Sequence, residues 1–456
     1  MRKTSLTRDF TTGSIPIRLL TFAVPFMLSN ALQGVYSAVD MIIVGKYVGT
    51  AALPAVEQSS KVLNFATMVC MGFSTGGQIL VAQALGAGKK KELGRIIGTL
   101  FDLILLLGAA LSVAAVLLRR SVTAWIRMPA ESAEMALSYL LICGAGLVFT
   151  AGYNMVSAVL RGMGDSRRPF WFIALASVLN LLFDLLFTGR LGWGVAGAAA
   201  ATILGQAISF LTSLVYLYRR RGDFGFTFTR ENFIPEKKYA GMIVSLGAPV
   251  AVQGGFINLS MVYVSAMVNR AGMIAAATFS TGMKIDDVIN RISYGLHLAV
   301  VPIVAQNIAA GEEERVKSAV HYAWIYSGVF TLVAVGGYVL CGRELFSLFT
   351  DDPAVFALVP TFVRGIVWLF PPLVIMRGTS GMIQGIGNTR LSMLLAILDG
   401  VALRIGLSWL FGSVFGLGFF GYTLGYALAP YGCAIPGLIY YLSGRWRRYR
   451  TLSEQI

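Results

Sequence analysis

The chain has 456 residues, of which 56% are hydrophobic and only 13% are charged, and its formal net charge is +15. Charged residues make up about a quarter of an average soluble protein, so this chain cannot cover a water-facing surface, and lipid must surround most of it. The basic residues stand in short gaps between long apolar runs, which argues against a nucleic-acid-binding protein and indicates that they orient the chain in a bilayer.

The apolar runs predict an all-α protein with twelve membrane-spanning helices, because a span needs about 20 mostly apolar residues. The predicted spans are 16–45, 52–84, 96–118, 134–160, 169–187, 194–218, 239–268, 273–308, 318–341, 354–384, 390–412 and 417–442. The first run is too long for the core of a signal peptide and has no small-residue cleavage site after it, so we expect it to stay in the membrane. Proline kinks are expected at Pro25, Pro249, Pro302, Pro371 and Pro372.

Basic residues are about three times as frequent in alternate gaps, beginning with the N-terminal segment, as in the others. This bias predicts that both termini are cytoplasmic, in agreement with an even number of spans, and we expect a multi-pass protein of the plasma (bacterial inner) membrane. Cysteine and histidine are scarce and have no metal-ligand spacing, and no nucleophile and base stand together. We therefore expect no cofactor and no enzymatic activity.

The chain repeats itself at an offset of about 223 in residue number. Three pairs of segments carry the repeat: 81–88 with 304–311, 161–167 with 384–390, and Pro25 with Pro249. Two duplicated six-helix halves follow, and because six is even, both enter the membrane from the same side and are related by a twofold axis along its normal. The predicted organisation is an N-lobe at 1–218, a polar cytoplasmic linker at 219–238 and a C-lobe at 239–456. Two such lobes around a central cleft favour alternating-access transport, with a channel or a structural protein as the alternative.

Ionisable groups at membrane depth are costly and mark function by default. Asp40 shares a helix face with Tyr36 and Gln33, and Asp184 shares one with Asn180. Further polar side chains inside predicted spans are Tyr139, Asn154 and Thr202. If they converge, the carboxylates could carry a proton, or the oxygens together could bind a dehydrated Na⁺. The alternative is that each group only satisfies a neighbouring helix, as threonine often does within its own helix.

The repeat offers an internal comparison. An offset of about 223 carries Asp40 to about Val264, and it carries the other three positions to apolar residues or glycine: Asn180 to Leu403, Asp184 to Leu407 and Thr202 to Gly425. A group needed only to hold six helices together should occur in both halves. The comparison therefore indicates an asymmetric functional cluster in the N-terminal half.

Other charges inside predicted spans favour structural roles. Glu57 and Lys61 are spaced as an ion pair, and Asp102 is expected to meet the nearby lysines. Four charges of zero net sum predict a buried network in the C-lobe, with substrate contact as the alternative: Lys284, Asp286, Asp287 and Arg291. Arg404, with Arg364 and Arg377, could line a path for anionic groups or pair with Asp399.

Several segments together resemble the multidrug and toxic compound extrusion (MATE) family over nearly the whole chain. They are Val39–Gly45, Gln83–Gly88, Arg161–Arg167, Leu179 through Asp184, the glycine- and alanine-rich run from Gly192 to Ala199, and Ala201-Thr202. The resemblance implies a V-shaped pair of lobes and an antiporter that exports organic cations and hydrophobic drugs against inward H⁺ or Na⁺. It also implies that Asp40, Asn180, Asp184 and Thr202 form the N-lobe cation site, joined by Tyr36, Tyr139 and Asn154.

One departure concerns the C-lobe. NorM-like members carry acids in spans seven and ten, but residues 242–269 and 354–383 contain neither Asp nor Glu. The pattern resembles the DinF-like or MepA-like branches, which rely on the N-lobe acids. Lys284-Ile285-Asp286 stands where the family often has Arg-Ile-Glu.

The sequence thus predicts a monomeric cation-coupled drug exporter whose partners are small-molecule drugs and the lipid bilayer. The competing prediction is a flippase for a lipid-linked oligosaccharide or peptidoglycan precursor, whose phosphates would bind a cleft lined by Arg364, Arg377 and Arg404. The residues alone leave H⁺ and Na⁺ as equal candidates.

Overall fold

The computed structural model describes residues 9–222 and 229–454. The basic residues Arg2, Lys3 and Arg8 and part of the predicted linker 219–238 lie outside this range. The described residues form helices and no strand, which confirms the all-α class. Ten of the helices are long and apolar enough to cross a membrane, and an eleventh span results if α4 and α5, which meet at an angle of 44°, are counted as one.

The helices of the first half follow the predicted apolar runs. They are α1 (Ile15–Tyr47), α2 (Ala52–Gly86), η1 (Lys90–Glu92), α3 (Leu93–Trp125), α4 (Ala130–Ala145), α5 (Leu147–Gly162), α6 (Arg167–Asp184), the π-helix η2 (Leu185–Arg190) and α7 (Gly194–Arg220). The short 3₁₀-helix η3 (Arg230–Phe233) follows in the predicted linker. Glycine or a tight turn, rather than a long loop, joins most neighbours.

The second half has the same order with more interruptions. It comprises α8 (Lys237–Arg270), α9 (Met273–Ala309), α10 (Glu313–Ser347), α11 (Pro353–Ile366), η4 (Val367–Leu369), α12 (Phe370–Gly385), α13 (Thr389–Ile397), the π-helix η5 (Leu398–Ile405), α14 (Gly406–Trp409), the π-helix η6 (Leu410–Val414), α15 (Gly418–Leu428), α16 (Tyr431–Leu442), η7 (Arg445–Arg448) and η8 (Leu452–Glu454). The predicted span 417–442 consists of two helices, α15 and α16, which are divided at Ala429 and Pro430, and proline lacks the N–H that a continuing helix needs. Neither α15 nor α16 is long enough to cross a membrane alone.

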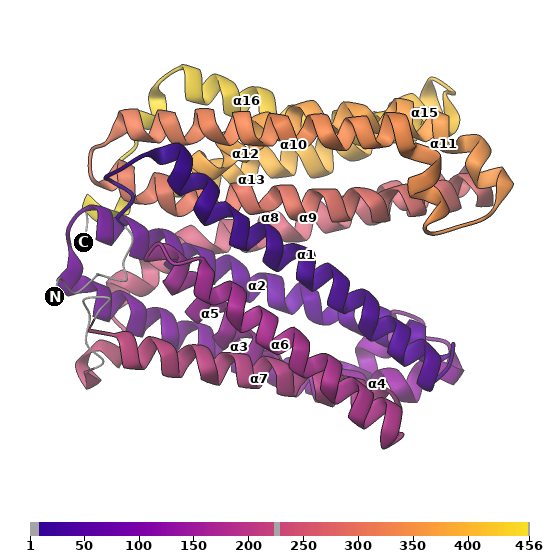
Figure 1. Cartoon of the computed structure of the whole chain (residues 1–456), viewed down its shortest axis with the longest axis horizontal. Coiled ribbons are helices and arrows are strands. Elements are labelled where there is room, and N and C mark those ends of the chain that lie inside the picture. Colours follow the sequence, from indigo (N-terminus) through magenta and orange to yellow (C-terminus); the bar gives the residue numbers. More distant parts are fainter. Residues whose placement is uncertain (1–8, 223–228, 455–456) are drawn as a thin grey trace. The chain divides into compact units, whose positions relative to one another are not determined.

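The chain forms two compact units, each built of long helices (Figure 1). Of the described residues, the first unit contains Asp9 and those within 28–251, and the second contains residues 10–27 and 252–454. Each half of the repeat therefore gives the leading part of its first helix to the other unit: α1 up to Met27 belongs to the second unit, and α8 up to Ala251 belongs to the first. The predicted lobes 1–218 and 239–456 follow the sequence repeat. The compact units differ from these lobes because the leading segments of α1 and α8 each belong to the other unit. Pro25 and Pro249 lie two residues before the two exchange points.

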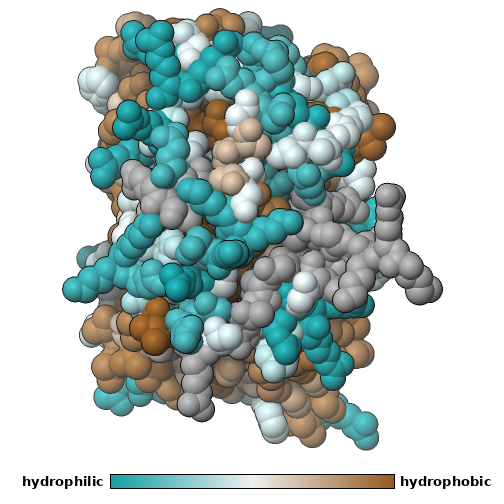
Figure 2. All heavy atoms as spheres, turned by 90° about the vertical axis from the view of Figure 1, so that its left-hand side faces the viewer, coloured by the Kyte–Doolittle hydropathy of each residue, from teal (hydrophilic) through white to brown (hydrophobic). Residues whose placement is uncertain are grey.

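The surface of the long helices is largely apolar. Trp125 is 84% exposed, Leu340 is 81% exposed and Leu332 is 74% exposed, which would be unfavourable in water but is normal where lipid covers the helix. By contrast, hydrophilic side chains cover much of the face onto which Figure 2 looks, at the helix ends on the left of Figure 1. This distribution is the one expected of a membrane-spanning protein.

Glycines with positive φ mark the same turns in both halves. Three pairs differ in residue number by 223: Gly49 and Gly272, Gly88 and Gly311, and Gly164 and Gly387. Two later pairs differ by 224: Gly192 and Gly416, and Gly194 and Gly418. The left-handed backbone at these positions favours glycine in both halves. The duplication is therefore visible in the backbone, and the second half gains one residue between Gly387 and Gly416.

The π-helix η5 accommodates this extra residue. The corresponding stretch of the first half belongs to α6, which is α-helical throughout, whereas the other π-helices, η2 and η6, occupy equivalent positions at an offset of 224. A π-helix bonds residues five apart instead of four, so it takes up an insertion without ending the helix. After the insertion, residues of the two halves correspond at an offset of 224 instead of 223.

A close helix approach confirms the offset of 224 in this region. A Cβ on Gly197 would meet Phe187 and Thr188, and one on Gly421 would meet their equivalents, Phe411 and Gly412. At Gly421 the Cβ would come closer to the Phe411 carbonyl oxygen than any real contact allows.

Replacing Gly421 with Ala is therefore expected to lower the free energy of unfolding by about 1–3 kcal/mol, because the backbones of α15 and η6 must separate. Thermal unfolding of the purified protein measures this loss. Gly336→Ala in α10 is the matched control, since a Cβ there meets no atom within 4 Å. Equal stability of the two variants would contradict the close packing.

Candidate functional site

Five helices of the first unit, α1, α2, α4, α6 and α7, bring polar side chains together around two carboxylates. Asp40 on α1 and Asp184 on α6 lie within hydrogen-bonding reach of each other. Tyr36, one turn before Asp40, lies close enough to interact electrostatically with both, and so does Cys143 on α4. Tyr139, one turn before Cys143, lies near Asp40. Residues that are more than a hundred positions apart in sequence thus surround one carboxyl pair.

Three of the four oxygens of this carboxyl pair lack a hydrogen-bond donor among the described residues. Asp184 is 1% exposed, and neither of its carboxylate oxygens has a hydrogen-bond donor among the described residues; the same holds for Oδ1 of Asp40. Two adjacent carboxylates whose oxygens are largely shielded from water repel each other when both are ionised, and an unpaired buried charge is costly. The pair therefore requires a shared proton or a bound cation to be stable.

Asn180 and Thr202 stand beside this pair. The Asn180 amide donates to the Thr202 hydroxyl over 3.4 Å, and this hydroxyl donates to the Ala198 carbonyl of its own helix over 3.0 Å. Asn180 is buried one turn before Asp184 on α6. The arrangement joins α6 to α7 and leaves the side-chain oxygen of Asn180 and one lone pair of the Thr202 hydroxyl free to accept a further bond.

The site contains two residues that the sequence does not predict, Ser60 and Cys143. Two predicted members, Asn154 and Gln33, are not hydrogen-bonded to it among the described residues. Ser60 on α2 donates to the Tyr139 hydroxyl over 3.0 Å, and Cys143 follows Tyr139 by one turn. The helical spacing of Cys143 could have revealed it, whereas nothing in the sequence singles out Ser60. Asn154 donates to the Thr150 carbonyl of its own helix, and no hydrogen bond in the described part of the chain links Gln33 to the cluster.

The charges of α9 form two groups rather than the predicted single network. Asp287 and Arg291 make an exposed ion pair of 2.6 Å, while Asp286 is 2% exposed and accepts from the Asn290 amide over 3.1 Å. Lys284 is exposed and joins neither group through an ion pair within the described residues. The prediction of one buried network is wrong because successive side chains of a helix point about 100° apart.

The arginines of the second half are bound to their neighbours. Arg377 donates through Nε to the Ser293 hydroxyl over 2.9 Å and through Nη2 to the Asn290 side-chain oxygen Oδ1 over 2.5 Å. Arg404 pairs with Asp399 at 3.0 Å. Arg364 is exposed, so it does not join the other two in one buried site.

Of the two remaining predicted ion pairs, one is present in the structure and the other is not. Glu57 and Lys61 form the expected exposed ion pair at 2.8 Å, which confirms that prediction. Asp102 does not meet the lysines: its buried Oδ2 has no hydrogen-bond partner among the described residues.

The offset of 224 corrects the comparison between the halves. It places Arg404 at the position of Asn180, Ser408 at that of Asp184 and Tyr426 at that of Thr202. The contact is equivalent too, since the Arg404 guanidinium carbon lies 4.8 Å from the centre of the Tyr426 ring, as Asn180 meets Thr202. The predicted loss of polar side chains from the second half is therefore wrong, because the extra residue in η5 shifts the alignment. The second half replaces an acid and two neutral groups by a cation, a hydroxyl and a phenol.

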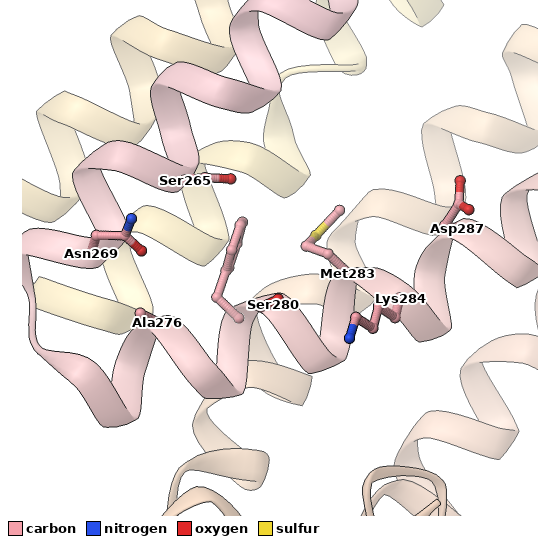
Figure 3. A pocket seen from close by; sticks show the side chains of 8 residues that line it. Ser265, Asn269, Ala276, Ser280, Met283, Lys284 and Asp287 are labelled. Carbon is pink, nitrogen blue, oxygen red and sulfur yellow. The ribbon is translucent and has the colours of Figure 1, made fainter. Parts of the chain in front are cut away.

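A cavity of about 450 Å³ lies between α8 and α9 in the second unit (Figure 3). Serine, asparagine and charged side chains line it beside Phe279 and Met283: Ser265, Asn269, Ser280, Lys284 and Asp287. In Figure 3, Ser265 and Asn269 extend from α8 on one side, and Met283 rises from α9 on the other. A space of this size with mixed lining suits part of an amphipathic small molecule.

Comparisons with known proteins agree with this architecture. The MatE family model matches residues 25–186 and again residues 249–410, two matches of equal length at the same offset of 224. The probable multidrug resistance protein YpnP of Bacillus subtilis is 28% identical over 98% of this chain and 99% of its own length. The probable multidrug resistance protein NorM of Thermotoga maritima is 26% identical over 96% and 94%. The outward-facing structure of a multidrug resistance MATE family transporter of the MOP superfamily is 23% identical, covers 98% of this chain and 99% of that one, and superposes with a TM-score of 0.91.

Proposed function

Because the chain belongs to the MatE family, whose members are membrane transporters and not enzymes, we propose that it is a secondary antiporter for drugs. In this proposal it exports organic cations or hydrophobic drugs in exchange for inward H⁺ or Na⁺, and the coupling ion binds at Asp40, Asn180, Asp184 and Thr202. The relatives' names, which refer to multidrug resistance, support the substrate class. We expect the transporter to act as a monomer in the bacterial inner membrane with both termini in the cytoplasm.

The observation that carries the proposal is the Asp40–Asp184 pair, two mutually close carboxylates with buried oxygens that no protein donor satisfies among the described residues. Such a pair binds one positive charge tightly and changes its electrostatic energy when that charge leaves. Carboxylate, amide and hydroxyl oxygens can ligate Na⁺, and the carboxylates alone can hold a proton.

The helix α1 offers a route from ion binding to movement. It carries Asp40 in the first unit, while its leading part, up to Met27, belongs to the second. Pro25 interrupts its backbone hydrogen bonding near the exchange point, so bending there costs less than elsewhere in the helix. Loading or emptying of the carboxyl pair would bias this bend and thereby the access of substrate.

The flippase alternative depended on a basic cleft. Arg377 and Arg404 are held by Ser293, Asn290 and Asp399, and Arg364 is exposed, so these three side chains do not form a phosphate-binding set. We therefore favour drug export.

We also propose that the chain lies outside the NorM-like branch of the family. The relatives' names do not support this placement, because a NorM-named protein is among them. The placement rests instead on the absence of Asp and Glu from residues 242–269 and 354–383.

Export from proteoliposomes with separately imposed gradients tests the proposal. A fluorescent cationic drug is trapped on the side equivalent to the cytoplasm, and an inward H⁺ gradient or an inward Na⁺ gradient is imposed alone. We expect one of the two gradients to accelerate drug efflux, and efflux without a gradient to remain slow. Identical efflux with both gradients and with neither would refute coupled antiport.

A further inference from the structure

The second half holds a buried charged cluster around Arg404, at the position equivalent to Asn180. Arg404 is 6% exposed, and its Nη2 donates to both carboxylate oxygens of Asp399, over 3.0 and 3.3 Å. Its guanidinium stacks on Tyr426, and it also interacts electrostatically with Asp286. The groups facing Arg404 are thus two carboxylates and a phenol.

The π-helix η5 makes the central pair possible. Asp399 and Arg404 are five residues apart, a spacing that points side chains about 140° apart in an α-helix but places them on one face of a π-helix. The first half has no counterpart of η5, because α6 is α-helical there. The π-helix therefore aligns Asp399 with the arginine.

The cluster neutralises itself. Two buried arginines, Arg377 and Arg404, accompany two buried aspartates, Asp286 and Asp399. A guanidinium does not lose its proton in proteins, so Arg404 is a cation that cannot leave. The first half has the opposite property: its two carboxylates have no basic side chain in an ion pair with them among the described residues and must obtain their positive charge from an ion.

We propose that the second half contains a cation-binding site that is permanently filled by Arg404. In this arrangement the guanidinium takes the place of the exchangeable ion, the second half binds no coupling ion, and ion exchange is confined to the Asp40–Asp184 pair. The proposal deepens the proposed coupling function and rests on it for the role of the first half. It predicts that removal of the guanidinium uncovers a second site, because the Asp399 oxygens and the unpaired Oδ1 of Asp286 then lack a positive charge.

The test counts cations bound to the full-length chain in which the first site is silenced by Asp40→Asn and Asp184→Asn. Into this background Arg404→Asn is introduced, and Arg404→Lys serves as the control that keeps a tethered cation. Equilibrium binding of radioactive Na⁺ and proton uptake on mild acidification are both measured. We expect about one additional Na⁺ or H⁺ per chain with Arg404→Asn, none with Arg404→Lys, and loss of the gain when Asp286→Asn is added. A folded Arg404→Asn chain that gains neither ion overturns the proposal.

A reciprocal variant decides the question if Arg404→Asn does not fold. Asn180→Arg in the otherwise unaltered chain places a guanidinium next to the first carboxyl pair, and Asn180→Gln controls for side-chain size. We expect Asn180→Arg to lower cation binding at least tenfold below that of the Asn180→Gln chain, which alters the amide but adds no charge; equal cation binding by the two variants overturns the proposal. Failure of the coupling function itself is recognised separately, by equal cation binding to the unaltered chain and to the Asp40→Asn/Asp184→Asn chain.

Discussion

Replacing Asp40 with Asn, or Asp184 with Asn, is expected to abolish gradient-driven drug export while the protein still folds and inserts. Asparagine has nearly the same volume as aspartate, so the packing of α1, α4 and α6 is kept. It cannot bind or release a proton, and it removes one of the two charges that attract a cation to the pair. Efflux in proteoliposomes should fall to the rate seen without a gradient.

Equal amounts of correctly folded protein must be compared, which gel filtration and thermal unfolding establish. Glu57→Gln is the matched control, because Glu57 is also an acid within a predicted span but forms an exposed pair with Lys61 on α2. It should export at the normal rate, since exposed pairs contribute less than about 1 kcal/mol. Normal export by both aspartate variants would show that the carboxyl pair does not couple transport.

The positions of the helices could be predicted because a membrane imposes a simple rule on the sequence. Runs of about 20 apolar residues had to become helices, and ends such as those of α7 and α9 agree with the predicted 194–218 and 273–308 within a few residues. The grouping of Asp40 with Tyr36 and of Asp184 with Asn180 follows from helical spacing in the same way. Spacing does not predict which helices meet at those faces. The hydrogen bond between Ser60 on α2 and Tyr139 on α4 is a contact of this kind.

The errors in the second half have a common physical origin. Closeness in sequence predicts one group of Lys284, Asp286 and Asp287, but a helix directs these side chains to different surroundings. The comparison of Asn180 with Leu403 assumed a constant offset, but one inserted residue makes Arg404 the equivalent position. A π-helix leaves the hydrophobic pattern of a span almost unchanged, so apolar periodicity cannot reveal it. The paired glycines at 192 and 416 could have revealed it, because they require an offset of 224.

Removing the carboxylate of Asp399 is expected to destabilise the protein by about 3 kcal/mol. Asp399→Ala leaves the Arg404 guanidinium buried without its ion-pair partner, and breaking one side of a buried pair is among the costliest single changes. Asp286 retains part of the electrostatic compensation, so the loss should stay near the lower end of the usual range. Unfolding by a denaturing detergent, followed by tryptophan fluorescence, measures the change.

The second substitution Arg404→Leu should restore most of this stability in the Asp399→Ala chain. It removes the uncompensated charge and fills the space beside Tyr426 with an apolar side chain, and a buried ion pair replaced by such a side chain is often close to neutral. If Asp399→Ala alone were as stable as the unaltered chain, the pair would be solvated rather than buried. If the double variant were no more stable than the single one, the loss would come from the missing volume in η5. Recovery in the double variant would instead show that Asp399 stabilises the protein by balancing the charge of Arg404, which the π-helix η5 places on the same helix face.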